Sequence, residues 1–364
     1  MKHPPMKTGL PKGAIKPRPA VVAMAPYAPP TAGRMDKLRL DFNENTVGCS
    51  PTVIEALRGG LQAAHLAVYP EYGEARAEIA GYFGVEPGEF VFTNGTDEAI
   101  QVFLNTYVDD GQEVVVLKPS YAMYRFYAEV AGARIKEVAY TQPGMEFPLQ
   151  ELLDAITADT RAVLFANPNN PTGTGTTLLG IERILHKARK AAVLVDEAYY
   201  EFSGVTALTE IARVPNLFVC RTFSKVFGMA AMRVGCLFSH AANIQFLHKA
   251  QSPYSVNALA IMAARAAVRD QAYVERYVAE VLAAREVLCV GLEKLGIAYV
   301  PSSANFVLAR FGERAIAVRD ALRGRSILVR DRSYEVPGHV RITVGTRAQI
   351  RRLLDALEEV WNGA

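Results

Sequence analysis

Hydrophobic and polar positions alternate in a regular rhythm through the middle of the chain. Short runs rich in β-branched residues occur at residues 90–93, 113–117, 162–165, 191–195 and 217–220. Amphipathic stretches with a helical period separate most of these runs, and the clearest are residues 97–108, 121–131, 148–156 and 178–188. Strands that alternate with helices predict a mostly parallel sheet with helices on both faces.

The boundaries of several helices can be read from single residues. Ser50 and Pro51 are typical of an N-cap followed by the first helical position, which predicts a helix running toward Leu61. Gly84 is expected to end a helix that begins near Glu74.

The pattern changes after about residue 255. A long helical stretch over 257–295 precedes three apolar segments, "ANFVLARF", "ILVRDRSY" and "VRITVG", and a last helix over 348–361. We therefore expect three parts, which are an N-terminal arm over 1–35, a large domain over 61–255, and a smaller α+β domain made of 36–60 and 256–364. The first twenty residues of the arm are basic and rich in proline, and they lack the apolar core of a signal peptide.

Composition narrows the possible partners. The 364 residues fit two domains, and the net charge of +3 is too small to indicate a nucleic-acid or membrane partner. No apolar run is long enough to span a membrane, and the six histidines lack metal-ligand spacing, so no metal is expected. The four cysteines form no CxxC pair and are typical of a reducing, cytoplasmic compartment; they are Cys49, Cys220, Cys236 and Cys289.

Polar segments follow each of the five predicted strands. In chain order they are "NGTDEAI", "KPSYAMY", "ANPNNPTGTG", "DEAYYEF" and "RTFSKVFGMAAMR". Because ligands bind beyond the carboxyl ends of the strands in open parallel sheets, these segments are expected to form one pocket. The first segment suits a phosphate, since a glycine-containing turn opens a helix there, although an ordinary N-capped helix has the same pattern.

Two charged residues indicate what else the pocket binds. Asp196 ends the apolar run "AAVLVD", so its carboxylate needs either a cationic partner or backbone amides. Lys225 follows the last strand, and Thr222, Ser224 and Arg233 around it can hold an anion. A desolvated lysine can form a Schiff base with an aldehyde. Pyridoxal 5′-phosphate combines an aldehyde, a cationic ring nitrogen and a phosphate, and so satisfies all three requirements.

From about Leu38 to Trp361 the chain resembles the fold-type I pyridoxal-phosphate aminotransferases (class I/II), and most closely the histidinol-phosphate aminotransferase group. The segments that carry the resemblance are "LDFNEN", "YPEYG", "NGTDEAI", "PSYAMYRFYAEVAGA", "NPNNPTG", "VDEAYYEF", "RTFSKVFGMAAMRVG" and "RITVGT". The resemblance implies an α/β fold with a large, mostly parallel-sheet domain and a smaller α+β domain.

The resemblance also implies roles for individual residues. Lys225, Asp196 and Tyr199 would be the catalytic residues, with Lys225 as the Schiff-base lysine and Asp196 paired with the pyridine nitrogen. Tyr199 and Asn170 would hydrogen-bond the phenolic oxygen of the ring, and Tyr121 would stack on the ring. The residues implied to hold the cofactor phosphate are Gly95, Thr96, Asp97, Thr222 and Arg233, and Ser224 is also expected to contact the cofactor.

The remaining implied contacts concern the substrate and a second subunit. Arg341 would bind the substrate α-carboxylate, Arg330 would bind the substrate phosphate, and Asn45 and Asn170 would also contact the substrate. Tyr69 would reach the cofactor phosphate of the partner subunit, which implies a homodimer with shared active sites. Two positions depart from the family pattern: Thr46-Val47-Gly48 replaces a proline, an aromatic residue and a glycine, and Ala231 replaces a common glycine.

The resemblance predicts transamination between histidinol phosphate, in histidine biosynthesis, and 2-oxoglutarate. Two alternatives on the same scaffold are an aromatic amino acid aminotransferase and a decarboxylase of an amino-acid phosphate such as threonine phosphate. The segments "RTFSK" and "DEAYYEF" favour the transaminase over the decarboxylase. A non-catalytic cofactor-sensing domain of a transcription regulator is disfavoured, because the 20 to 40 residues that precede the domain would not hold a helix-turn-helix or a basic DNA-binding extension.

Overall fold

The computed structural model describes residues 13, 15–26, 31–141 and 144–363. The start of the expected N-terminal arm, residues 1–12, lies outside them. In its described part the arm contains one short helix, α1 (Pro19–Ala23).

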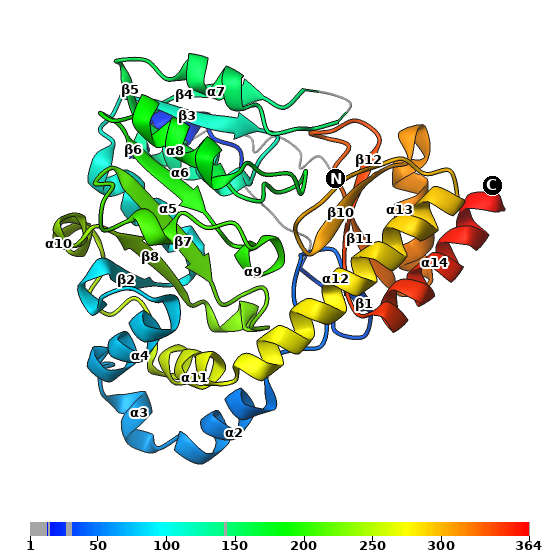
Figure 1. The fold of residues 1–364 in the computed structure, drawn as a ribbon, viewed down its shortest axis with the longest axis horizontal. Coiled ribbons are helices and arrows are strands. Elements are labelled where there is room, and N and C mark those ends of the chain that lie inside the picture. Colours follow the sequence, from blue (N-terminus) through cyan, green and yellow to red (C-terminus); the bar gives the residue numbers. More distant parts are fainter. Residues whose placement is uncertain (1–12, 14, 27–30, 142–143, 364) are drawn as a thin grey trace.

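The larger sheet has seven strands in the order β2-β8-β7-β6-β5-β3-β4 (Figure 1). Every neighbouring pair is parallel except those of β8, which is antiparallel to both β2 and β7. The strands are β2 (Phe90–Thr93), β3 (Glu113–Lys118), β4 (Arg134–Ala139), β5 (Thr160–Ala166), β6 (Ala192–Asp196), β7 (Leu217–Thr222) and β8 (Gly235–Ser239).

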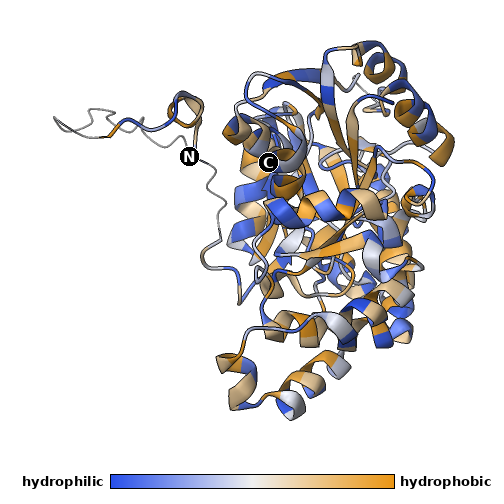
Figure 2. Ribbon diagram, turned by 90° about the vertical axis from the view of Figure 1, so that its left-hand side faces the viewer, coloured by the Kyte–Doolittle hydropathy of each residue, from blue (hydrophilic) through white to orange (hydrophobic). Residues whose placement is uncertain are grey.

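Helices cover both faces of this sheet, because side chains along each strand alternate between two cores. In β3, Val114 and Val116 face one core, whereas Val115 and Leu117 face the other. The first core is closed by α5 (Gly95–Tyr107), α6 (Ala122–Ala131) and α10 (Ala241–Ala250), and the second by α4 (Gly73–Phe83), α7 (Leu149–Ala155), α8 (Leu178–Lys187) and α11 (Ala258–Arg269). Figure 2 shows apolar strands among helices that carry both hydrophilic and hydrophobic stretches, as amphipathic helices should.

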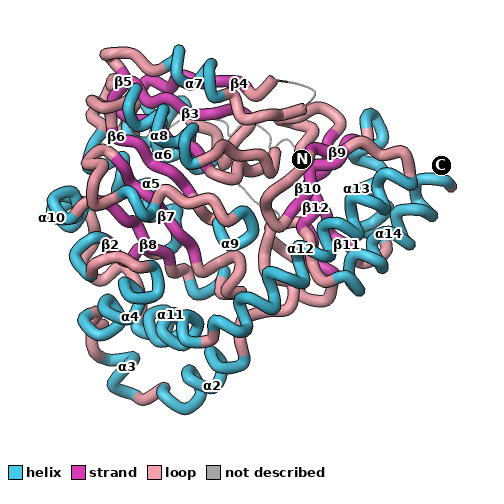
Figure 3. The backbone as a smooth tube through the Cα atoms, viewed as in Figure 1, coloured by secondary structure: helices cyan, strands magenta, loops and turns pink. Residues whose placement is uncertain are grey.

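A smaller sheet stands beside the larger one (Figure 3). Its order is β1-β11-β12-β10-β9, and β1 pairs in parallel with β11 although the two are far apart in the sequence. The strands are β1 (Leu38–Leu40), β9 (Tyr299–Val300), β10 (Phe306–Arg310), β11 (Ile327–Asp331) and β12 (His339–Thr343). The α helices not yet named are α2 (Pro51–Gly60), α3 (Ala63–Ala67), α9 (Tyr200–Ser203), α12 (Gln271–Lys294), α13 (Ala315–Gly324) and α14 (Arg347–Asn362). Four short 3₁₀ helices cover Pro87–Glu89, Leu208–Glu210, Ala230–Met232 and Gly312–Arg314.

The expectation of one helix over 257–295 is wrong, because Asp270 separates α11 from α12. The Asp270 backbone is not helical, and its carboxylate accepts the backbone N–H of Tyr273, which caps α12. The same carboxylate accepts hydrogen bonds from the hydroxyls of Ser50 and Thr52 at the start of α2. None of the described helices is both long and apolar enough to cross a membrane.

Candidate active site

A cavity of about 490 Å³ lies beyond the carboxyl ends of the larger sheet, where residues of the smaller sheet close it. It brings together residues from all five polar segments that follow predicted strands. The predicted site residues that line it are Thr96, Asp97, Tyr121, Asn170, Asp196, Tyr199, Thr222, Ser224, Lys225, Arg233, Arg330 and Arg341. The expected convergence at one edge of the sheet is therefore observed.

Lys225 lies between the two sheets. Its Nζ donates a 3.1 Å hydrogen bond to the backbone carbonyl of Phe42, in the segment that follows β1. Burial lowers the pKa of Lys225 to about 8, and the positive charge of Arg341 acts in the same direction. A larger fraction of this amine is consequently neutral and nucleophilic near neutral pH than for an exposed lysine.

Asp196 ends β6 and is buried. Its carboxylate accepts hydrogen bonds from the Tyr124 hydroxyl, at 2.7 Å, and from the backbone N–H of Ala198, at 3.0 Å. Burial raises the pKa of Asp196, and no Lys, Arg or His among the described residues forms an ion pair with it. A carboxylate buried without a cationic partner suits a ligand that brings its own protonated nitrogen.

The anion site expected at the start of α5 has a specific backbone arrangement. Asn94, at the N-cap position, makes no capping hydrogen bond through its side chain, which distinguishes this terminus from an ordinary capped helix. Gly95 has a φ of +74°, and a Cβ there would lie 2.4 Å from Nη2 of Arg233, so only glycine lets this guanidinium cross the terminus. Arg233 also forms a 3.2 Å ion pair with Asp97, which accepts a 2.7 Å hydrogen bond from Tyr121.

Arg330 and Arg341 are directly opposite each other on β11 and β12. Arg341 donates to the Asn170 side-chain oxygen and to the backbone carbonyl of Asp41, and its Nε is buried without a partner among the described residues. Burial and the neighbouring Arg332 lower the pKa of Arg341 to about 10. Neither Arg330 nor Arg341 forms an ion pair with a described carboxylate, and Glu335, which attracts both, is paired with Arg332. This end of the cavity therefore has an excess of positive charge suited to an anion.

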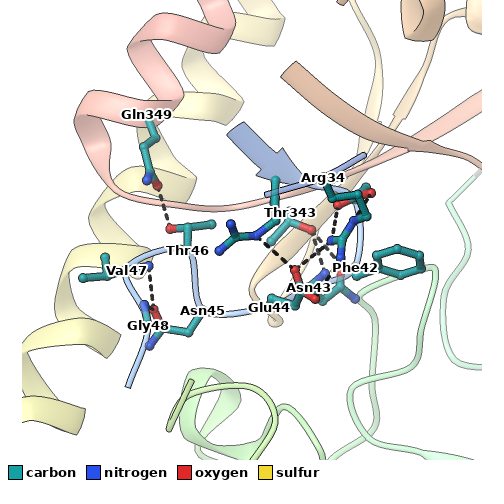
Figure 4. Close-up of polar contacts among 12 residues, drawn as sticks. Arg34, Phe42, Asn43, Glu44, Asn45, Thr46, Val47, Gly48, Thr343 and Gln349 are labelled. Atoms are coloured by element: carbon teal, nitrogen blue, oxygen red, sulfur yellow. Dashed lines mark hydrogen bonds and ion pairs between the residues drawn. The ribbon is translucent and has the colours of Figure 1, made fainter. Parts of the chain in front are cut away.

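The predicted role of Asn45 requires correction, because its side chain is turned away from the cavity. It donates to the backbone carbonyl of Val226 and accepts the backbone N–H groups of Val47 and Gly48, which closes a turn (Figure 4). Asn43 faces the cavity instead, and its side chain donates to the hydroxyl of Tyr199.

Two other residues also lie outside the cavity. Val47, at the position where the family pattern has an aromatic residue, is 59% exposed and does not line it. Tyr69 is 72% exposed and stacks on Tyr254 with ring centroids 4.3 Å apart. Its expected contact with a partner subunit stays a prediction.

Seven polar or aromatic residues that line the cavity were not predicted from the sequence, namely Thr31, Arg34, Phe42, Asn43, Glu44, Tyr124 and Arg332. Tyr124 was within reach of sequence reasoning, because it lies one helical turn after Tyr121 on α6. Arg34 fell in the expected arm, but it pairs with both Asp41 and Glu44 at 2.7 Å (Figure 4). Only the folded chain shows that this arginine belongs to the cavity.

The arrangement fits pyridoxal 5′-phosphate. One end offers Arg233 and the start of α5, which its N-cap side chain leaves uncapped. The middle offers a buried carboxylate that has no cationic partner among the described residues, and next to it an amine of lowered pKa. Lys225 and Asp196 share this cavity, as the cofactor hypothesis requires.

Known proteins resemble the chain along nearly its whole length. The family "Aminotransferase class I and II" matches residues 35–357. A histidinol-phosphate aminotransferase of Symbiobacterium thermophilum is 36% identical over 94% of this chain and 97% of its own, and one of a Geobacillus species is 35% identical over 90% and 91%.

The fold comparison agrees with the sequence comparison. The crystal structure of histidinol-phosphate aminotransferase from Sinorhizobium meliloti, in complex with pyridoxal-5′-phosphate, superposes with a TM-score of 0.86. It covers 96% of this chain and 99% of its own at 25% identity. The α/β architecture is thus that of the fold-type I aminotransferases, and the chain belongs to the class I and II aminotransferase family.

Proposed function

We propose that this protein is a pyridoxal 5′-phosphate-dependent aminotransferase that moves the amino group of histidinol phosphate to 2-oxoglutarate. The observation that carries the proposal is the pair Arg330 and Arg341, two guanidinium groups without carboxylate partners in the same cavity as Lys225. The phosphate of histidinol phosphate and the two carboxylates of 2-oxoglutarate are anions that such a pair of arginines can bind. Several relatives that are 32–36% identical are named histidinol-phosphate aminotransferase.

The catalytic roles follow from the surroundings of each side chain. When bound, pyridoxal phosphate supplies an electron-withdrawing ring that accepts the electron pair of the substrate carbon. Lys225 would take the proton from the amino-bearing carbon of the donor and, in the second half-reaction, deliver a proton to the corresponding carbon of the oxo-acid acceptor. Its lowered pKa leaves part of the amine neutral and able to accept a proton near neutral pH. Asp196 holds the proton of the ring nitrogen, since its buried carboxylate has no other cation.

Other side chains orient the reactants. Tyr199 and Asn170 would hold the phenolic oxygen of the ring, and Asn170 is itself held by its 2.5 Å hydrogen bond from Arg341. Thr96, Ser224 and Arg233, together with backbone N–H groups at the start of α5, would hold the cofactor phosphate.

Replacing Arg330 by alanine tests the substrate. We expect KM for histidinol phosphate to rise roughly 10- to 100-fold, because a charged hydrogen bond to the phosphate is lost. Steady-state transamination is measured with histidinol phosphate, phenylalanine and tyrosine, each with 2-oxoglutarate. Arg310→Ala is the matched control, because Arg310 is exposed at the end of β10 and lies outside the cavity lining. Equal rates with phenylalanine and histidinol phosphate would instead support an aromatic aminotransferase.

We also propose that the protein is a homodimer whose partners complete each other's sites. A group of exposed apolar side chains surrounds α3 and supports an interface there, consisting of Leu61, Leu66, Val68, Tyr69 and Tyr254.

The four cysteines are all free, which fits a cytoplasmic enzyme.

Tyr69→Phe tests the shared site. We expect the dissociation constant for pyridoxal phosphate to rise about tenfold, because a hydroxyl hydrogen bond to the phosphate is lost, while the dimer persists. Cofactor binding is followed by fluorescence and the dimer by sedimentation equilibrium. Tyr254→Phe is the control, since it removes a hydroxyl from the same stacked pair. A monomeric wild-type protein, or equal effects of the two substitutions, would contradict the proposal.

A further inference from the structure

Phe42 is the aromatic residue that the segment after β1 gives to the cavity. Its ring lines the cavity, whereas Val47, in the same segment, is exposed outside it. Two guanidinium groups lie over this ring: the Cζ atom of Arg34 is 4.2 Å from the ring centroid and that of Arg330 is 5.3 Å from it.

The two guanidinium groups differ in how they are held. Arg34 donates hydrogen bonds to both carboxylates that flank Phe42, those of Asp41 and Glu44, so its charge is compensated and its position is fixed (Figure 4). Arg34 is therefore part of the wall and has no free charge to offer an anion. Together with the two carboxylates it fixes the segment that carries the Phe42 ring.

The side chain of Arg330, by contrast, has no hydrogen bond or ion pair with any residue in the described part of the chain, although the Glu335 carboxylate, which pairs with Arg332, attracts it. Its neighbour across the sheet is Arg341, which repels it. An arginine side chain has many rotamers, and the positive charge of Arg341 favours rotamers that carry the Arg330 guanidinium away from it. The contact that holds its guanidinium toward the cavity is the face of the Phe42 ring, because a cation is attracted to that face.

We infer that Phe42 is a specificity-determining residue, because it holds the Arg330 guanidinium where the phosphate of the substrate must bind. This inference rests on the proposed function and names the part of the site that selects a phosphorylated amino donor. The role belongs to the ring alone. The hydrogen bond from Lys225 goes to the backbone carbonyl of Phe42, which a side-chain substitution retains.

Phe42→Leu tests the inference, since it keeps an apolar side chain but removes the aromatic face. The measured quantity is kcat/KM for histidinol phosphate divided by kcat/KM for histidinol, the same donor without phosphate. This ratio is expected to fall about tenfold, mainly through KM for the phosphorylated donor. The inhibition constant of inorganic phosphate should rise by a similar factor. Phe42→Tyr, which keeps the ring, should restore both values to within about twofold of the wild type.

A double-mutant cycle separates this role from a merely structural one. In an Arg330→Gln background, Phe42→Leu should change the ratio by less than about twofold, because the group that it holds is already absent. An effect that persists in this background, or a loss shared equally by both donors, overturns the inference.

The failure of the inference differs from the failure of the proposed function. If Arg330→Gln lowers the ratio but Phe42→Leu does not, the inference alone is wrong. If the wild-type enzyme shows no preference for the phosphorylated donor, the proposed function itself is wrong. The melting temperature of each variant shows whether a substitution disturbs folding. Recovery of activity in Phe42→Tyr shows that position 42 tolerates a substitution that keeps the ring.

Discussion

Lys225→Ala is expected to reduce transamination by on the order of 10⁴-fold or more, because it removes the amine that moves the proton at the substrate carbon. Nothing nearby replaces it, since the other cations that line the cavity are arginines, which do not lose their proton near neutral pH. Single-turnover and steady-state rates are both measured, because the variant can still bind the cofactor through its phosphate contacts.

Lys249→Ala is the matched control for Lys225→Ala. Lys249 lies exposed on α10, with its Nζ 5.1 Å from the centre of the Phe246 ring. Wild-type rates are expected in this control. Partial recovery of Lys225→Ala by added methylamine would show that an amine, rather than the shape of the side chain, is what was lost. Unchanged turnover in Lys225→Ala would refute the assignment of the active site.

Asp196→Asn is expected to lower kcat on the order of 10²- to 10³-fold. The amide has nearly the shape of the carboxylate and retains a hydrogen-bonding oxygen for Tyr124 or Ala198, but it has no charge to hold a proton on the ring nitrogen. The substitution also removes a buried charge that has no cationic partner. The free energy of unfolding should therefore not decrease, although kcat does.

The thermal melting temperature and kcat are therefore measured together for Asp196→Asn. Its control is Asp154→Asn, which makes the same chemical change on the exposed side of α7. A loss of less than about threefold in kcat would mean that this carboxylate has only a structural role.

The rhythm of the chain was enough to predict the centre of the larger sheet. The five predicted strands are all present. Their apolar runs are buried on both faces, which is the environment of a central strand in a parallel sheet covered by helices. Strand β4 was missed since it lies at the edge of the sheet and mixes charged with apolar residues. Strand β8 was missed because it follows the lysine segment directly.

Other predictions from the sequence failed because they depend on contacts that form only in the folded chain. The break at Asp270 depends on hydroxyls of Ser50 and Thr52, more than two hundred positions away, which no local pattern shows. Asn45 was expected to contact the substrate, but it is Asn43, with a φ of 56°, that lines the cavity and donates to the hydroxyl of Tyr199. The position of Arg34 over the Phe42 ring likewise requires the folded segment.

The hydrogen bond from Lys225 to the carbonyl of Phe42 has a mechanical consequence. Phe42 follows a strand of the smaller sheet, whereas Lys225 follows the last strand of the parallel part of the larger one. Two other hydrogen bonds, from Asn43 to Tyr199 and from Arg341 to Asn170, join the same two halves, and a rotation of one sheet against the other would change all three. The position of the Lys225 amine therefore depends on how the two halves of the molecule are packed, as well as on the strand that it follows.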